Sequence, residues 1–79
     1  MHYVYILECA DSSLYAGYTN DLDKRLKVHN QGKGSKYTRA RLPVKFVYSE
    51  TVESKSDGLK REYQIKQLTR KQKEELIKL

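Results

Sequence analysis

Two short strand patterns joined by turn residues stand at the start of the chain and constrain its fold most. Residues 2–8 (His-Tyr-Val-Tyr-Ile-Leu-Glu) and 14–18 (Leu-Tyr-Ala-Gly-Tyr) are rich in aromatic and β-branched side chains, which favour strands. Between them, the residues at 11–13 (Asp-Ser-Ser) have short polar side chains that bond to their own backbone, as turn residues do. The pattern predicts a hairpin. Gly17 indicates a point where its backbone comes close to another group.

A helix is predicted directly after the hairpin. Residues 19–21 (Thr-Asn-Asp) offer N-cap candidates, and the helical pattern continues to Asn30. Gly32 follows it and can adopt the left-handed conformation that closes many helices. Residues 35–42 are polar and basic, and we expect a loop there with one helical turn.

The second half of the chain predicts one more strand and two more helices. Residues 44–52 form an apolar run that favours a strand covered on both faces. A capping signal at Ser54 precedes a helix expected over residues 56–68. Thr69 and Gln72 have capping-box spacing, which predicts a last helix that extends to residue 79.

The predicted order of elements is therefore β-β-α-β-α-α. It indicates an α+β domain: a small three-stranded antiparallel sheet flanked by helices. A length of 79 residues allows one domain, so we expect residues 1–79 to fold as a single unit. Leu76, Ile77 and Leu79 give the last helix an apolar side, which either packs into the core or docks a protein partner or a second copy.

Cysteine content and hydropathy exclude several classes of protein. Cys9 is the single cysteine, so the chain cannot form an internal disulfide, and no Cys/His set has zinc-finger spacing. The longest apolar stretch is only a few residues, which predicts no membrane span. No basic-then-apolar leader precedes the first strand pattern, so we expect a cytoplasmic protein.

The charge is unevenly distributed along the chain. The formal net charge is +6, and residues 24–48 contain eight Lys and Arg but no Asp or Glu. A basic segment of this kind favours a polyanionic partner, nucleic acid first, whose phosphate backbone it would contact without reading sequence. The candidate nucleic-acid-binding residues are Lys24, Lys27, Lys33, Lys36, Arg39 and Arg41.

The tyrosines are the first candidates for chemistry. Four of the seven lie in the predicted hairpin. Tyrosine commonly fills half-buried strand positions, so packing alone accounts for any one of them. The functional interpretation is a phenol that passes a proton, which requires a nearby cation or metal because a free phenol titrates near pH ~10.

Three further residues fit phosphate chemistry. Arg25 and His29 are four apart on the predicted helix and so share one side of it; they suit a phosphate clamp and a proton carrier. Each residue alone is also ordinary, as a solvated surface cation and a packing residue. Glu62 is either a carboxylate ligand for Mg²⁺ or one half of an ion pair with Lys66, four residues on.

In sequence order these residues resemble the GIY-YIG nuclease superfamily. Tyr3-Val4-Tyr5 and, ten residues later, Tyr15-Ala16-Gly17 are similar to its paired motifs. Arg25 and His29 follow Tyr15 by ten and fourteen residues, as in the helix of that family. Residues 34–38 and 59–66 resemble its small, stand-alone bacterial subgroup. The resemblance covers nearly the whole chain.

The resemblance implies a role for each motif residue. Tyr5 and Tyr15 would lie close together on the hairpin, with Tyr15 positioning the attacking water. Arg25 would neutralise charge at the scissile phosphate, and His29 would assist proton transfer by taking the proton of a phenol. Glu62 would hold one Mg²⁺ or Mn²⁺ that stabilises the leaving oxygen. Hydrolysis of a phosphodiester needs a deprotonated water, charge stabilisation at the phosphate and help for the departing oxygen.

The chain departs from the family pattern at two points. The first motif begins with Tyr3 where the family has Gly, and no Asn follows Asn30 to match the late-chain Asn of several family nucleases. Gly17 would let the hairpin pack closely beside the tyrosine pair.

Three functions are consistent with the sequence. The first is a divalent-metal-dependent endonuclease that hydrolyses DNA, with DNA repair or recombination as its expected setting. The second keeps the fold as a nucleic-acid-binding or repair-partner module with weak or no hydrolysis. The third is an interaction domain whose charge only serves solubility.

Overall fold

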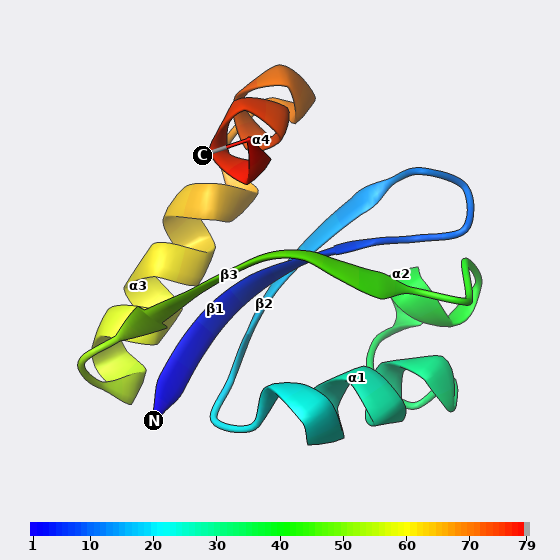
Figure 1. Cartoon of the computed structure of the whole chain (residues 1–79), viewed down its shortest axis with the longest axis horizontal. Helices are drawn as coiled ribbons and strands as arrows, with labels where there is room; N and C mark the ends of the chain where they lie inside the picture. Colours follow the sequence, from blue (N-terminus) through cyan, green and yellow to red (C-terminus); the bar gives the residue numbers. More distant parts are fainter. Residues whose placement is uncertain (79) are drawn as a thin grey trace.

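The hairpin at the start of the chain forms as predicted. The computed structural model describes residues 1–78 (Figure 1). Strand β1 spans His2–Glu8 and pairs antiparallel with β2, Leu14–Thr19. In the turn between them, the Asp11 carboxylate accepts a hydrogen bond from the backbone N–H of Ser13 at 3.0 Å, which is the self-bonding turn chemistry that the sequence indicates.

A third strand completes the sheet on the other side of β1. Strand β3, Lys45–Val52, pairs antiparallel with β1, so the strand order is β2-β1-β3. The predicted three-stranded antiparallel sheet and α+β class are confirmed. The expectation that residues 44–52 would be covered on both faces is wrong: β3 is an edge strand whose side chains are half-buried or exposed. The central strand is β1, with Val4–Leu7 fully buried.

Within residues 1–78 four helices form, each preceded by an N-cap whose side chain accepts a backbone N–H. Three of these caps, at Asp21, Ser54 and Thr69, precede the three longer helices that the sequence predicts. The helices are α1 Leu22–Asn30, the short α2 Lys36–Arg39, α3 Lys55–Lys66 and α4 Arg70–Ile77. Helix α2 is the single turn expected within residues 35–42, and Gly32 has the left-handed φ of 79° that was predicted to close α1.

The helices cover the two faces of the sheet separately, which gives three layers (Figure 1). On the face of α3 and α4, the buried apolar cluster consists of Val4, Ile6, Ala16 and Ile65. On the face of α1, it consists of Tyr5, Leu7, Cys9 and Val44. Leu76 and Ile77 of α4 pack against the first cluster, so this apolar side serves the core; Leu79, predicted to share it, lies outside the described residues. No helix within residues 1–78 is long and apolar enough to cross a bilayer.

Candidate active site

The pairing of β1 with β2 places Tyr5 directly opposite Gly17. Both residues lie on the face covered by α1, as does Tyr15, because side chains alternate between the faces of a sheet. A Cβ atom on Gly17 would overlap the phenol ring of Tyr5. The glycine therefore leaves the space into which the Tyr5 ring crosses over the neighbouring strand, which is the close approach predicted at this position.

Helix α1 brings Arg25 and His29 to this phenol. Leu22 and Leu26 pack against the cluster that contains Tyr5, so the helix presents the same side to the sheet. The end of α1 is fixed by Asn30, whose side-chain amide exchanges hydrogen bonds of 2.8 and 3.2 Å with the backbone of residue 44. The spacing of four residues then places Arg25 and His29 side by side above Tyr5.

A continuous chain of hydrogen bonds runs through the site. Arg25 Nε donates to the Tyr5 hydroxyl at 3.3 Å, and the same hydroxyl lies 3.0 Å from His29 Nε2. On the other side of the imidazole, Nδ1 lies 2.9 Å from Thr38 Oγ1, which itself donates to the Ser35 carbonyl at 3.4 Å. Since Thr38 donates onward, it accepts from His29 Nδ1–H, which leaves Nε2 to accept the Tyr5 proton.

The loop between α1 and α2 closes over the imidazole at Gly34. A Cβ atom on Gly34 would overlap the ring of His29, so only glycine lets the backbone lie this close. The Gly34 carbonyl accepts a hydrogen bond from Arg25 Nη2 at 3.3 Å. The loop therefore shields His29, which is completely buried, and orients the guanidinium at the same time.

Burial sets the protonation of the central pair. Desolvation, with a smaller contribution from the charge of Arg25, lowers the pKa of His29 from 6.5 to about 4. Desolvation also raises the pKa of Tyr5, against the opposing effect of its hydrogen bond from Arg25. At neutral pH the phenol is therefore protonated and the imidazole neutral, which is the state required for Tyr5 to donate to His29.

Arg25 has donors left for a ligand. Its guanidinium is half-buried, yet it forms no ion pair with a carboxylate within residues 1–78, and both N–H groups of Nη1 are without a partner there. A shallow hollow of about 190 Å³ lies beside it, lined in part by Lys24, Asp21 and Asn20. A partly desolvated cation without an acidic partner favours an anionic ligand.

Tyr15 is held by ring contacts instead of hydrogen bonds. Its ring lies 5.5 Å from the ring of His29, edge to face, and is stacked on Tyr37 at 5.9 Å between centroids. The Lys66 ammonium lies 5.5 Å from the Tyr15 ring centroid. Within residues 1–78 the Tyr15 hydroxyl has no hydrogen-bond partner, so it is available to water or substrate.

Glu62 comes from α3, which packs against the opposite face of the sheet. It lies near enough for its charge to raise the pKa of Tyr5, and Lys66 pairs with it at 3.0 Å. The ion pair between Glu62 and Lys66 is therefore confirmed, and Glu62 as a metal ligand stays a prediction. Residues 1–78 contain no group of three Asp, Glu, His or Cys side chains that could hold a metal. A lone carboxylate suits Mg²⁺, which keeps several waters and uses substrate phosphate as a ligand.

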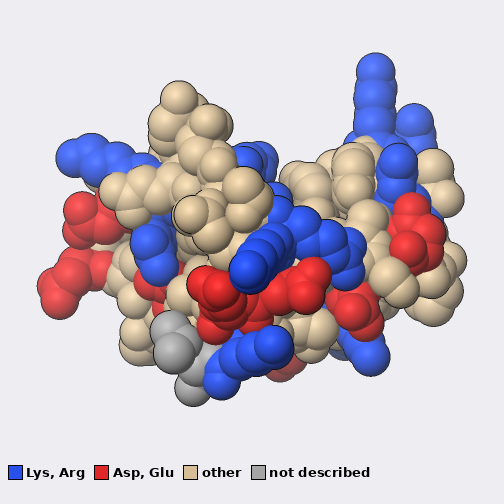
Figure 2. Space-filling view, turned by 90° about the horizontal axis from the view of Figure 1, so that it is seen from above, with Lys and Arg blue, Asp and Glu red and all other residues tan. Residues whose placement is uncertain are grey.

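Five of the six candidate phosphate-binding residues have exposed side chains: Lys24, Lys27, Lys33, Lys36 and Arg39. The sixth, Arg41, is bound to Asp11 and Tyr37. By contrast, the face of the molecule that carries α4 has acidic and basic residues intermixed (Figure 2). The exposed basic residues lie on α1, on α2 and in the loop between them, and Arg25 also lies on α1.

A larger hollow, about 640 Å³, lies elsewhere. It is on the outer side of α3 and is lined by Ser56, Leu59, Lys60, Tyr63 and Gln64. None of these residues belongs to the hydrogen-bonded chain around Tyr5. We therefore identify the site by its chemistry and not by the size of the hollow.

The five motif residues predicted from sequence are brought together, although their roles stay predictions. The structure adds Thr38, Gly34 and Tyr37, to which sequence reasoning gave no role. Their positions depend on how the loop after α1 folds back over His29, and a polar, basic loop pattern has no local signal for that. The phenol that bonds to His29 is Tyr5.

Residues 1–75 match the protein family described as the GIY-YIG catalytic domain. A UPF0213 protein of Bacillus velezensis is 60% identical over 76 residues, which are 96% of this chain and 77% of that protein. A UPF0213 protein of Clostridium perfringens is 61% identical over 77 residues, 98% of this chain and 83% of that protein.

Two solved structures share the fold. The solution NMR structure of a UPF0213 protein from Bacillus halodurans aligns with a TM-score of 0.62 at 51% identity, and covers 98% of this chain and 82% of that chain. A solution NMR structure of a protein from E. faecalis aligns with a TM-score of 0.65 at 47% identity over the same shares. The tyrosine motifs, the strand order and the matches over almost the whole length agree: the chain belongs to the GIY-YIG family.

Proposed function

We propose that the chain is a divalent-metal-dependent endonuclease that hydrolyses DNA phosphodiester bonds. Family membership supports nucleic-acid binding in general. The observation that carries the proposal is Arg25: a half-buried guanidinium without a carboxylate partner in residues 1–78, hydrogen-bonded to a phenol that is itself bonded to a neutral histidine. An anion-binding group joined to a path for a proton is what phosphoryl chemistry requires. Repair or recombination as its setting stays a prediction.

The protonation states suit proton transfer that begins once substrate binds. The charge of Arg25 contributes to the low pKa of His29. A phosphate bound to Arg25 offsets that charge, so the pKa of His29 rises and the imidazole becomes a better base. Tyr5 then passes a proton to Nε2 across the 3.0 Å contact and can receive one from the attacking water. Tyr15, with its free hydroxyl, orients that water.

Glu62 is the residue that would hold the metal ion. When bound, Mg²⁺ or Mn²⁺ supplies charge stabilisation for the departing oxygen and the phosphate. Within the site, the Lys66 ammonium forms an ion pair with Glu62 at 3.0 Å. A Lys side chain is flexible and 45% exposed here, so it can leave Glu62 for a DNA phosphate.

Nicking of supercoiled plasmid with and without Mg²⁺ or Mn²⁺ tests the proposal. We expect Tyr5→Phe, Arg25→Ala and Glu62→Gln each to lower the rate at least about 100-fold, the usual scale for removing an acid–base or charge-stabilising group. Glu75→Gln is the matched control, since Glu75 is an exposed acid on α4. Nicking by Glu62→Gln and Tyr5→Phe at the wild-type rate would overturn the catalytic assignment.

A binding module without turnover is the second candidate. It is favoured by the ion pair between Glu62 and Lys66, and residues 1–78 contain no group of three Asp, Glu, His or Cys side chains that could hold a metal. Such a module binds DNA with an affinity that falls steeply with salt while the plasmid stays intact at every metal concentration. Metal-dependent nicking that is lost in Glu62→Gln excludes it.

A further inference from the structure

The Tyr15 ring is held in place by contacts with other side chains. Its hydroxyl has no hydrogen-bond partner within residues 1–78, so the direction of the phenol is set only by what packs on the ring. The stacked contact is Tyr37, with centroids 5.9 Å apart and planes 24° apart. His29 contacts the edge-to-face side of the Tyr15 ring and Tyr37 stacks on it, so whatever fixes Tyr37 also restricts Tyr15.

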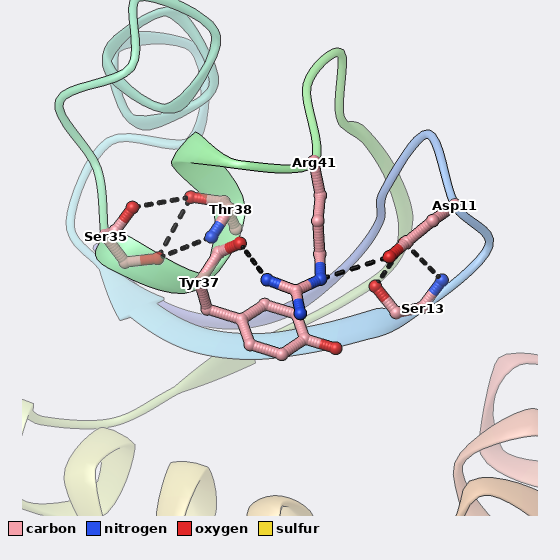
Figure 3. A network of polar contacts seen from close by, with 6 residues as sticks. All are labelled: Asp11, Ser13, Ser35, Tyr37, Thr38 and Arg41. Atoms are coloured by element: carbon pink, nitrogen blue, oxygen red, sulfur yellow. Dashed lines mark hydrogen bonds and ion pairs between the residues drawn. The ribbon is translucent and has the colours of Figure 1, made fainter.

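Tyr37 cannot be fixed by its own helix. Helix α2 has four residues, too few to be stable alone in water, and the Tyr37 side chain is 38% exposed. Arg41, just past the end of α2, supplies two contacts. Its Nη1 donates to the Tyr37 carbonyl at 2.8 Å, and its guanidinium carbon lies 4.0 Å from the ring centroid, as Figure 3 shows.

Arg41 is in turn tied to the hairpin turn, thirty residues away in sequence. Its Nε donates to Asp11 Oδ2 at 3.1 Å, and the other oxygen of Asp11 accepts from the backbone and hydroxyl of Ser13 (Figure 3). The backbone adds a further link, from Ala10 N–H to the Arg41 carbonyl at 2.9 Å. The turn of the hairpin and the end of α2 are thereby joined at both main chain and side chain.

Arg41 thus uses its Nε, one N–H of Nη1 and a face of its guanidinium for contacts inside the molecule. Arg39, two residues earlier in the chain, differs: its side chain is exposed and makes no hydrogen bond or ion pair within residues 1–78. The planar guanidinium of Arg can donate hydrogen bonds in two directions while it stacks on a ring, and the ammonium of Lys cannot. The two arginines therefore suit different tasks.

We propose that Arg41 is a positioning residue: anchored by Asp11, it holds Tyr37 against Tyr15 and so directs the Tyr15 hydroxyl into the site. This assigns Arg41 away from the phosphate contacts predicted from its charge, and leaves Arg39 among them. The inference deepens the proposed nuclease function and rests on it for its effect on rate.

DNA binding separates the two arginines. We expect Arg39→Ala to reduce the slope of log affinity against log salt concentration by about one, the change for one lost phosphate contact. Arg41→Ala leaves that slope at the wild-type value. The measurement is fluorescence anisotropy of a labelled duplex over a KCl series. An equal loss of slope in both variants overturns the proposal.

Asp11→Asn tests the positioning role, because the loss of its charge and the loss of its hold on Arg41 are expected to have opposite effects on the reaction. Removing an acid near a basic surface strengthens DNA binding, whereas loosening Arg41 displaces Tyr15. We expect kcat to fall by about 10-fold to 100-fold with no rise in KM, the scale for a reacting group that is misplaced by about an ångström. Tyr37→Leu has the same effect and Tyr37→Phe, which keeps the ring, restores the rate. Unchanged kcat in Asp11→Asn overturns the proposal.

A readout without turnover keeps the two proposals separable. The aromatic ¹H–¹³C spectrum reports the environment of the Tyr15 ring in the intact chain. We expect its ring resonances to shift in Asp11→Asn and Arg41→Lys but not in Arg39→Ala, with the amide spectrum confirming the fold. If the wild type does not nick DNA, the nuclease proposal fails while these shifts still support the link from Asp11 to Tyr15. Unshifted resonances in Asp11→Asn and Arg41→Lys overturn that link.

Discussion

On the α3 side of the sheet, Val4, Ile6 and Ile65 are completely buried and pack as an apolar cluster. On the α1 side, Tyr5 and His29 are buried to the same degree, but each is bonded to polar partners. Adjacent residues of β1 contribute to the two faces. An apolar face tolerates exchange of one hydrophobic side chain for another, whereas a buried polar face has to satisfy each donor and acceptor. The comparison locates stability on one face and chemistry on the other.

The largest effect we expect comes from emptying the apolar face. Ile65→Ala removes a completely buried side chain and leaves a cavity, so we expect a loss of about 2–5 kcal/mol in the free energy of unfolding. Ile65→Val loses about 0.5–1.5 kcal/mol. Urea denaturation followed by circular dichroism measures both. Equal losses in the two variants would mean that volume does not decide stability on this face.

The polar face is expected to make stability depend on pH. The pKa of His29 is about 4 in the folded protein and about 6.5 when unfolded, so the unfolded state binds more protons between these values. Stability is therefore complete above about pH 6.5 and falls as the pH drops toward 4, by up to about 3 kcal/mol. Urea denaturation at pH 7, 5.5 and 4.5 measures this loss. His29→Gln should remove the His29 contribution to it, and an unchanged pH dependence in that variant would contradict the assignment.

The third effect tests how tightly the polar face is fitted. A Cβ atom in Gly17→Ala would meet the hydroxyl end of Tyr5, and we expect this overpacking to cost about 1–3 kcal/mol. Tyr5→Phe removes the oxygen that lies nearest. The double variant Gly17→Ala/Tyr5→Phe should therefore be more stable than the sum of the single losses predicts. Additive losses would show that the ring carbons, and not the hydroxyl oxygen of Tyr5, carry the cost of the overlap.

Elements with local signals could be predicted from the sequence. Asp21, Ser54 and Thr69 cap their helices through contacts within three residues, and the predicted helices begin close to where the caps place them. The resemblance to the family supplied Tyr5, Tyr15, Arg25, His29 and Glu62, and the structure brings these together. The coverage of β3 was misjudged because burial depends on which strand takes the centre of the sheet, and an apolar run does not state that.

The partners of the site residues could not be predicted for the same reason. Thr38 orients His29 from nine residues further along the chain, and Asp11 holds Arg41 across thirty residues. Neither pair has a helical or strand spacing that periodicity would detect. Arg41 shows why charge alone is a weak predictor. Its positive charge predicted a contact with phosphate, whereas the structure shows it in contact with Asp11 and Tyr37.

The pairing of Tyr5 with Gly17 makes the site sensitive to the frame in which the strands are aligned. One residue inserted within β2 would shift every later side chain of that strand to the opposite face and put a side chain where the glycine was. Such an insertion would remove the chemistry even if the sheet still formed. Natural variation in length should therefore be found in the loops between elements, while the distance from Tyr15 to Gly17 is held constant.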